Sequence, residues 1–265
     1  MSSDVTGTLP QGELELEGRI VAASNATFRG TVDGTLVVYK PLIGEKPLWD
    51  FPDRTLARRE VASYVLSDAL GFDVVPRTWL RDGPFGEGMV QLWCEPVTDT
   101  SPVELVATPD APRLVADGWR HVLDGVDEDD EPVSLLHEDS PALRRMALFD
   151  VLVNNADRKI GHILPAAGGH LFGVDHGLTF HTEDKLRTVL WGWVGEDLQD
   201  AELAAVRAVR DGLTSDVTGG LAERLGELLS VAEVAALAGR CDRLLAAGRF
   251  PAPGGHMPAV PWPVF

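Results

Sequence analysis

Alternation of polar and apolar residues marks the first part of the chain. The stretch ELELEGRI (13–20) alternates in the manner of a half-buried strand. TLVVYKP (35–41) is a β-branched and aromatic run that stops at Pro41. Asp33-Gly34 lies just before it and is a hairpin signal, which pairs this run with ATFRGTV. Two further strands are predicted over 74–80 and 88–95.

One helix is predicted among these strands, over residues 54–71. Asp53 is a plausible N-cap, and Gly71 ends the helix. The apolar residues of this helix fall on one side, as expected of an amphipathic helix. They are Leu56, Val61, Tyr64, Val65, Leu66, Ala69 and Leu70.

The second part of the chain is predicted to be mainly helical. A helix over 140–155 has Ser140 as its cap and Pro141 at its first position. Two short apolar runs, HILP and HLFGV, follow and are separated by Ala-Ala-Gly-Gly (166–169), which indicates a hairpin. Residues 199–248 carry two or three helices rich in Ala and Leu.

These elements predict an α+β protein with two lobes. Residues 1–95 would form a small β-rich N-lobe with one helix, and residues 96–265 a larger helical C-lobe, together one domain. A chain of 265 residues is long enough for a sizeable core. Apolar residues make up 45% and charged residues 24%, which favours an ordinary globular protein over a disordered one.

The charge balance argues against some partners. Lys and Arg number 23 against 41 Asp and Glu, a net charge of −18, which repels nucleic acid and anionic lipid headgroups. Arg54, Arg58 and Arg59 form a local basic group, which we expect to be a solvated helix face. The acidic run DGVDEDDEP (124–132) is expected to be a solvated loop.

Targeting signals and cysteine patterns are missing from the sequence. The first residues have neither a basic n-region nor an apolar h-region, so we expect no signal peptide. No apolar run reaches the ~18 residues of a membrane span. Cys94 and Cys241 form no disulfide framework and no metal-ligand spacing. A cytoplasmic location is the simplest interpretation.

Four polar residues stand in an order that has chemical meaning. Lys40 ends a strand, where it can neutralise phosphates if Glu60 on the helix holds it in place. Asp157 comes just after a helix, where a loop can present it as a base. Asp175 precedes Gly177, which would let the backbone turn sharply and expose a metal-binding carboxylate.

Taken singly, each of these residues has an ordinary explanation. A strand lysine usually snorkels to solvent, and a mid-helix Glu60 is usually solvated. Asp157-Arg158-Lys159 is also what a charge cluster at a helix end looks like, and Asp-x-Gly is a common turn. The chain order, from strand lysine through helix glutamate to the two aspartates, favours phosphoryl transfer.

Six short segments carry a resemblance to a known family. They are SNATF (24–28), VVYKP (37–41), VVPRT (74–78), VQLWCE (90–95), NADRK (155–159) and GVDHGLTF (173–180). Together they resemble the kinase-fold phosphatidylinositol 3-/4-kinases, closest to the type II phosphatidylinositol 4-kinases and their bacterial relatives. The resemblance covers roughly residues 20 to 182 and implies a two-lobed, protein-kinase-like fold.

The resemblance also implies roles for single residues. Lys40 would contact the nucleotide phosphates with Glu60 holding it. Asp157 would be the catalytic aspartate, with Lys159 beside it, and Asp175 would ligate Mg²⁺. The adenine pocket would be lined by main-chain groups of Gln91, Leu92, Trp93 and Cys94. The loop over the phosphates would consist of Ser24, Asn25, Ala26 and Thr27.

Two features depart from that family. Five positions after Asp157 the family usually has an asparagine on the second metal, and here His162 stands there. An imidazole prefers softer ions than Mg²⁺, so His162 either ligates the metal and favours Mn²⁺, or is structural. The cysteine-rich palmitoylation stretch of type II lipid kinases is also missing.

The sequence therefore predicts a kinase that uses ATP and Mg²⁺ or Mn²⁺. The charge and the missing anchor favour a protein Ser or Thr, the chain itself or a small molecule as acceptor over a phosphoinositide. Alternatives are a nucleotide-binding module with little turnover, a phosphatidylinositol kinase and a nucleotidyl transferase. We expect no nucleic-acid partner and no stable membrane anchor. Leu178, Phe180 and residues 190–193 are either an acceptor site or a core edge, and the core is favoured.

Overall fold

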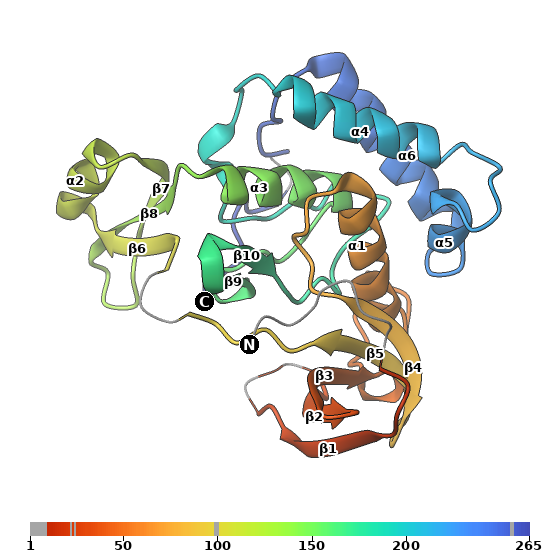
Figure 1. The fold of residues 1–265 in the computed structure, drawn as a ribbon. Helices are drawn as coiled ribbons and strands as arrows, with labels where there is room; N and C mark the ends of the chain where they lie inside the picture. The colour runs from red at the N-terminus through yellow and green to blue at the C-terminus, as the bar shows by residue number, and fades with distance from the viewer. Residues whose placement is uncertain (1–9, 22, 24, 98–100, 255–256) are drawn as a thin grey trace.

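An antiparallel five-stranded sheet forms the N-terminal part of the molecule (Figure 1). The computed structural model describes residues 10–21, 23, 25–97, 101–254 and 257–265. The strand order is β1-β2-β3-β5-β4. The bounds are β1 Leu14–Arg19, β2 Phe28–Val32, β3 Thr35–Pro41, β4 Thr78–Gly83 and β5 Gly86–Leu92.

The predicted hairpin between β2 and β3 is confirmed. Val32 pairs with Thr35, and the two residues between them, Asp33 and Gly34, both have positive φ angles of 50° and 75°. Two successive residues with positive φ match the twist of the flanking strands. This turn places β3, and with it Lys40, in the middle of the sheet.

Helix α1 (Leu56–Leu70) packs against β4 and β5 and is buried on nearly all sides. The prediction of an amphipathic helix with a solvated arginine face was therefore wrong for Arg59, which is 1% exposed. Its guanidinium pairs with Glu233 and donates to the carbonyl oxygen of Thr179. Asp53 is not the cap, because the N–H groups of Leu56 and Ala57 donate to the Glu45 carboxylate.

A second antiparallel sheet corrects the expectation that the chain turns helical after residue 96. It has the order β6-β8-β7 and lies to one side of α3 (Figure 1). Its elements are β6 Val103–Ala107, α2 Ala111–Ala116, β7 Trp119–Val126 and β8 Pro132–Glu138. The acidic run ends β7 and forms the exposed turn to β8, so most of it is solvated as expected.

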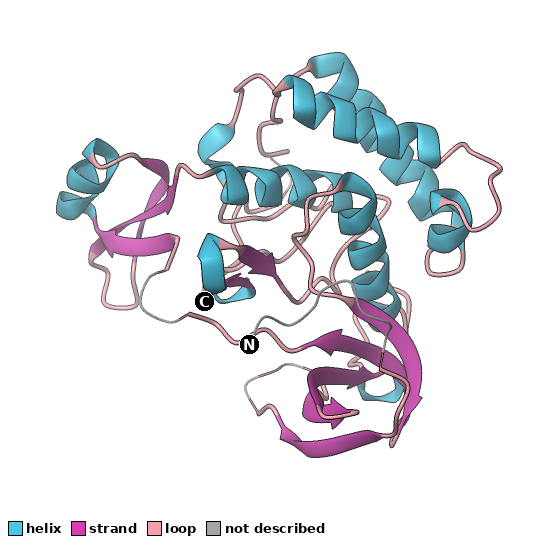
Figure 2. Ribbon diagram, in the orientation of Figure 1, coloured by secondary structure: helices cyan, strands magenta, loops and turns pink. Residues whose placement is uncertain are grey.

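In the described residues after β8, the regular elements are helices, 3-10 turns and one short hairpin, joined by loops (Figure 2). Ser140 caps α3 (Pro141–Val153) by accepting from the N–H of Leu143, as predicted. The predicted hairpin is the pair β9 (Ile163–Pro165) and β10 (Leu171–Gly173). The later helices are α4 Asp200–Gly212, α5 Leu221–Gly226 and α6 Val231–Ala247, and the 3-10 turns are η1 Leu42–Gly44, η2 Thr108–Asp110, η3 Ile160–His162, η4 Ala167–Gly169 and η5 Trp191–Trp193.

The main core surrounds α3. Phe180, Leu190, Trp191 and Trp193 belong to it, so the preference for a core role there is confirmed for these residues, whereas Leu178 is half-buried. Among the described residues, no helix is long and apolar enough to cross a membrane. The structure is thus a mixed α+β fold with an antiparallel sheet at its start and a largely helical second part.

Candidate active site

Lys40, Glu60 and Asp175 meet through one ammonium group. The Lys40 Nζ lies 2.5 Å from Glu60 Oε1 and 2.8 Å from Asp175 Oδ1. The Glu60 side chain is 2% exposed, whereas that of Asp175 is 54% exposed. Burial lowers the pKa of Lys40, but the charges of Asp175 and Glu60 outweigh it and the net shift is upward. Lys40 is therefore a fixed cation between a buried and an open carboxylate.

The two carboxylates respond to this cation differently. The Lys40 ammonium holds the pKa of Asp175 well below its usual range, so Asp175 is ionised at neutral pH. Burial raises the pKa of Glu60, although Lys40 opposes that shift. The second oxygen of Glu60 accepts a hydrogen bond from the backbone N–H of His176 at 3.0 Å, which ties α1 to the turn that carries Asp175.

The sharp turn lies at Asp175 itself and not, as expected, at Gly177. Asp175 has a φ angle of +59°, in the left-handed region that residues with a side chain rarely adopt. A side chain at Gly177 would instead meet Leu56 Cβ at 3.3 Å. Gly177 therefore serves the close approach of this turn to α1, and the turn projects the Asp175 carboxylate outward.

A buried ionic network holds the segment around Asp157. Arg158 and Asp150 are both 0% exposed and lie 2.8 Å apart, between Arg158 Nη2 and Asp150 Oδ1. Asn155 and Thr188 also donate to the Asp150 carboxylate. Arg158 Nη2 lies 2.7 Å from Nε2 of the buried His176. This network joins the Asp157 loop to the Asp175 turn.

The Asp157 carboxyl lies at the edge of this network and is 28% exposed. Its backbone N–H donates to Asn155 Oδ1 at 3.0 Å, and the Lys159 Nζ lies 3.8 Å from Asp157 Oδ2. Burial raises the pKa of Asp157, with Lys159 and His162 acting in the opposite direction. A raised pKa makes a carboxylate a stronger base, which suits proton abstraction from a hydroxyl.

His162 is oriented by a main-chain acceptor. Its Nδ1 lies 2.8 Å from the carbonyl oxygen of Asp157, so that nitrogen must carry the hydrogen. Burial lowers the pKa of His162, which keeps the ring neutral. Nε2 then has a free lone pair, and it lies 3.8 Å from Asp175 Oδ2. A nitrogen and an oxygen at this separation are compatible with one shared metal ion, since metal–ligand distances are about 2.0–2.2 Å.

The described residues supply only two groups to such an ion. Among them, no three His, Cys, Asp or Glu side chains converge as a metal site. Mg²⁺ in phosphate-transfer sites is commonly held by one or two protein groups together with phosphate oxygens and water. Asp175 and His162 therefore fit an ion that arrives with a nucleotide rather than one that the protein holds alone.

A small cavity adjoins these groups. Its volume is about 210 Å³, below the roughly 300–1,000 Å³ of whole-ligand pockets. Asn25 and Ala26 line it, whereas Thr27 is 4% exposed and Ser24 lies outside the described residues. The other lining residues are Lys40, Pro41, Glu45, Lys46, Leu48, Leu56, Ala57, Glu60, Asp157, Asp175, Gly177 and Leu178.

The loop at residues 25–27 is bound to the turn after β3. Asn25 Oδ1 accepts from the N–H of Lys46 at 2.9 Å, and the N–H of Ala26 donates to the carbonyl oxygen of Gly44. A side chain at Gly44 would come within 2.5 Å of Ala26 Cβ. These contacts hold Lys46, a residue that sequence reasoning missed, at the wall of the cavity.

The expected adenine-binding segment does not line this cavity. Gln91 is paired in the sheet, and its side chain donates to Thr78. The N–H of Leu92 donates to the carbonyl oxygen of Arg77 and that of Trp93 to the carbonyl oxygen of Leu36, so neither N–H is free for the adenine contact expected of this segment. Within the described part of the chain, the N–H of Cys94 makes no backbone hydrogen bond, so it remains available to a ligand.

Sequence reasoning missed Asp150 and Arg187 as well. Asp150 lies on α3, and its sequence context is that of an ordinary helix residue. Its role follows only from the structure, in which Arg158 donates to its carboxylate. The charge of Arg187 opposes the rise that burial causes in the pKa of Asp157. The Nε of Arg187 is buried without a hydrogen-bond partner among the described residues. No local pattern marks either residue, because their partners are fixed only by the folded chain.

Comparison with known proteins places the chain in a family. No family model matches it. It is 46% identical to Protein Rv2133c of Mycobacterium tuberculosis over 276 aligned positions, which cover 100% of this chain and 97% of the relative. The chain therefore belongs to the same family as Rv2133c, whose name states no activity.

A solved structure also resembles the chain, at low similarity. It is the crystal structure of a Helicobacter pylori proinflammatory kinase, CtkA. The match covers 90% of this chain and 93% of CtkA, with 11% identity and a TM-score of 0.44. Similarity at this level carries no argument about function, which rests on the site itself.

Proposed function

We propose that this protein is an ATP-dependent phosphotransferase of the protein-kinase-like, phosphatidylinositol-kinase-like type, with residues 1–95 and 96–265 as its two lobes. The observation that carries the proposal is the meeting of Lys40, Glu60 and Asp175 at one ammonium group. A lysine clamped by a helix glutamate, beside an open aspartate, is the arrangement that positions nucleotide phosphates and their metal. Asp157 lines the same cavity.

Each residue then has one task. Lys40, with Lys46 near it, neutralises phosphate charge, and Asn25 and Ala26 cover the phosphates. Asp175 and His162 would hold Mg²⁺ or Mn²⁺, which supplies charge neutralisation at the transferred phosphoryl group when it is bound. Asp157 accepts the proton of the acceptor hydroxyl, and its raised pKa supports that task. Lys159 steadies the Asp157 carboxylate from 3.8 Å.

With a volume of about 210 Å³, the cavity has room for phosphate groups but not for a whole nucleotide. The nucleoside would therefore extend along the sheet toward residues 91–94. There the N–H of Cys94 is the group that supports an adenine contact, since those of Leu92 and Trp93 are already paired. Burial raises the pKa of the Cys94 thiol to about 11, so Cys94→Trp blocks this position more completely than a thiol-directed label.

The acceptor proposed is a Ser or Thr hydroxyl of a protein, this chain included, rather than an inositol lipid. A net charge of −18 supports this choice, because an anionic membrane surface repels the protein.

Product analysis with ATP labelled at the γ-phosphate tests the proposal. The chain is incubated with Mg²⁺ or Mn²⁺, with and without inositol lipid vesicles, and its intact mass is then measured. ADP formation with a mass gain on the chain or an added protein supports the proposal. AMP with pyrophosphate would show a nucleotidyl transferase instead, and binding without product would show a regulatory nucleotide-binding module.

A further inference from the structure

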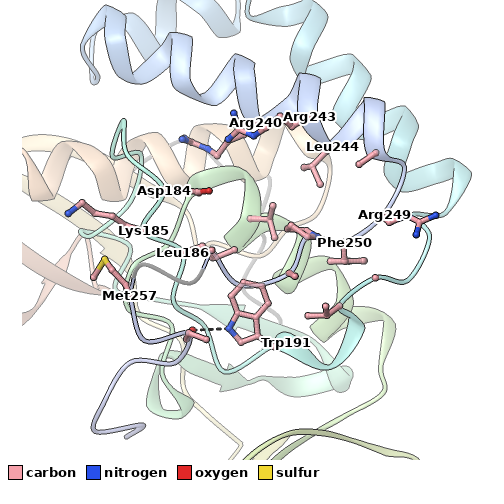
Figure 3. A pocket seen from close by; sticks show the side chains of 18 residues that line it. Asp184, Lys185, Leu186, Trp191, Arg240, Arg243, Leu244, Arg249, Phe250 and Met257 are labelled. Carbon is pink, nitrogen blue, oxygen red and sulfur yellow. Dashed lines mark hydrogen bonds between the residues drawn. The ribbon is translucent and has the colours of Figure 1, made fainter.

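A large cavity lies in the helical part of the molecule, apart from the candidate active site. Its volume is about 790 Å³, within the range of small-molecule pockets. It lies between α6, the segment 184–195 and the residues after α6 (Figure 3). Among the described residues, none lines both this cavity and the one at Asp175. A ligand here would therefore occupy a second site.

The wall of this cavity is largely apolar and includes aromatic rings. Trp191 and Phe250 lie on it together with Leu186, Leu244 and Met257. The indole Nε1 of Trp191 donates to the carbonyl oxygen of Ala259 at 2.8 Å, which fixes the ring in place. Rigid apolar surface of this kind binds the hydrocarbon part of a ligand.

Positive charge gathers at one side of the cavity. Figure 3 shows Arg240 and Arg243, both from α6, on the side opposite Trp191. Arg249 lines the cavity as well but pairs with Asp197 at 3.5 Å. Of the described residues that line the cavity, Asp184 is the one with a carboxylate. The chain as a whole has a net charge of −18, whereas this wall of the cavity carries two arginines.

Two of these arginines have unused hydrogen-bonding capacity. Arg240 is 5% exposed, and its Nε and Nη1 donate to the carbonyl oxygens of Leu152 and His181. Its Nη2 is buried with no partner among the described residues. Arg243 is exposed and makes no hydrogen bond or ion pair within the described part of the chain.

The charge of this pair is poorly compensated by the protein. Burial, followed by the charge of Arg243, lowers the pKa of Arg240 to about 10. Asp184 and Glu233 oppose this shift, but no carboxylate among the described residues forms an ion pair with Arg240. A buried guanidinium without such a partner is expensive to maintain. A bound anion would supply the missing partner.

We propose that this cavity binds an amphiphilic anion, whose hydrocarbon part lies against Trp191 and Phe250 and whose carboxylate or phosphate head is held by Arg243 and Arg240. Arg243 makes the direct contact, since it is exposed and free to reorient. Arg240 supplies the fixed charge behind it. The inference does not depend on the proposed phosphotransfer, and its test requires no turnover.

Titration calorimetry on the full chain tests the proposal with four probes below their micelle concentrations. Decanoate and decyl phosphate carry the two anionic heads on the same tail. Decyltrimethylammonium carries a cation on that tail, and inorganic phosphate is a head alone. We expect one or both amphiphilic anions to bind, and the cation and inorganic phosphate to bind at least about tenfold more weakly.

Three variants locate the binding. Arg243→Gln removes the proposed head contact and should weaken binding of the anion about tenfold. Ala247→Phe, at the exposed rim of the cavity, should weaken it by filling the space. Arg207→Gln, an exposed arginine on α4 that does not line the cavity, is the matched control and should bind as the wild type does.

Decanoate and decyl phosphate carry the same hydrocarbon tail, so a difference in their affinity shows whether the site prefers a carboxylate or a phosphate head. The proposal is overturned if neither anion binds, or if the cation binds as tightly as the anions. It is also overturned if Arg243→Gln and Ala247→Phe both bind the anion as well as the wild type does.

Discussion

Two ionic clusters lie side by side in this protein and differ in what they leave open. The cluster of Asp150, Arg158 and His176 is 0% exposed, and both oxygens of Asp150 are bonded to neighbouring groups. The cluster of Lys40, Glu60 and Asp175 is closed on the Glu60 side and open at Asp175. A closed cluster can only hold the backbone, whereas an open one can bind a ligand. The two clusters should therefore respond differently to substitution.

The largest expected effect comes from the closed cluster. Arg158→Leu leaves the Asp150 carboxylate buried without its counter-ion, which should destabilise the fold by about 3–5 kcal/mol. Denaturant unfolding measures this loss. The double variant Arg158→Leu/Asp150→Leu removes both charges and should recover much of the stability. A loss below about 1 kcal/mol in the single variant would mean that this network does not hold the loop.

Asp157→Asn should affect catalysis and leave stability unchanged. The Asp157 carboxylate is at the edge of the closed cluster, and the contact with Asn155 is made by the backbone N–H of Asp157, so the fold does not depend on the carboxylate. Loss of a general base lowers turnover by about 10²- to 10⁴-fold. Single-turnover rates with labelled ATP, alongside nucleotide affinity, test this. Turnover equal to that of the wild type would remove Asp157 from the mechanism.

Lys40→Met should combine both kinds of effect, because Lys40 belongs to a cluster that is closed on one side only. Nucleotide binding should weaken through the lost phosphate contact. The buried Glu60 loses its counter-ion, so its already raised pKa rises further. Glu60 would then bind a proton more tightly in the folded than in the unfolded chain, where its pKa is about 4.3. The free energy of unfolding of the variant should therefore fall as the pH rises above about 4.3.

The double variant Lys40→Met/Glu60→Gln separates these two effects. It should regain stability at neutral pH without regaining nucleotide binding. Unfolding curves at pH 5 and pH 8 provide the comparison. Equal stability of Lys40→Met at both values would contradict the account of Glu60 as a carboxylate that needs this partner.

The smallest effect is expected at His162. His162→Asn replaces the imidazole by an amide oxygen and should shift the preference from Mn²⁺ toward Mg²⁺. In the wild type, burial lowers the pKa of His162, so the ring stays neutral as the pH falls through about 6.5, the usual pKa of histidine. Activity with Mn²⁺ should therefore persist through that pH. Activity profiles with each metal between pH 5.5 and 8 decide this. A structural His162 would leave metal preference unchanged in the variant.

Elements with a local signal were predictable from the sequence. The bounds of β3 follow from a β-branched run between a hairpin dipeptide and Pro41, and α3 follows from Ser140-Pro141. The sheet β6-β8-β7 was missed, because its strands hold long runs of similar burial, such as residues 134–137 in β8, rather than an alternation.

Contacts in the candidate site were predictable in two cases: where the residues are close in sequence, and where their order along the chain resembles that of a known family. Lys40 and Glu60 are 20 positions apart on adjoining elements, whereas Lys40 and Asp175 are 135 apart and their contact needed the family resemblance. Arg59 was misjudged because its partner Glu233 lies 174 positions away. Burial of a charged residue depends on such a partner, which no local pattern shows.

The central claim is that the open cluster binds a nucleotide together with its metal. Calorimetric titration of the wild type and of Asp175→Asn with a non-hydrolysable ATP analogue, with and without Mn²⁺, tests it most directly. The account predicts binding that requires the metal in the wild type and is lost in Asp175→Asn, while Asp157→Asn binds normally. An absence of binding at millimolar nucleotide, or equal metal-dependent binding by Asp175→Asn and the wild type, would contradict it.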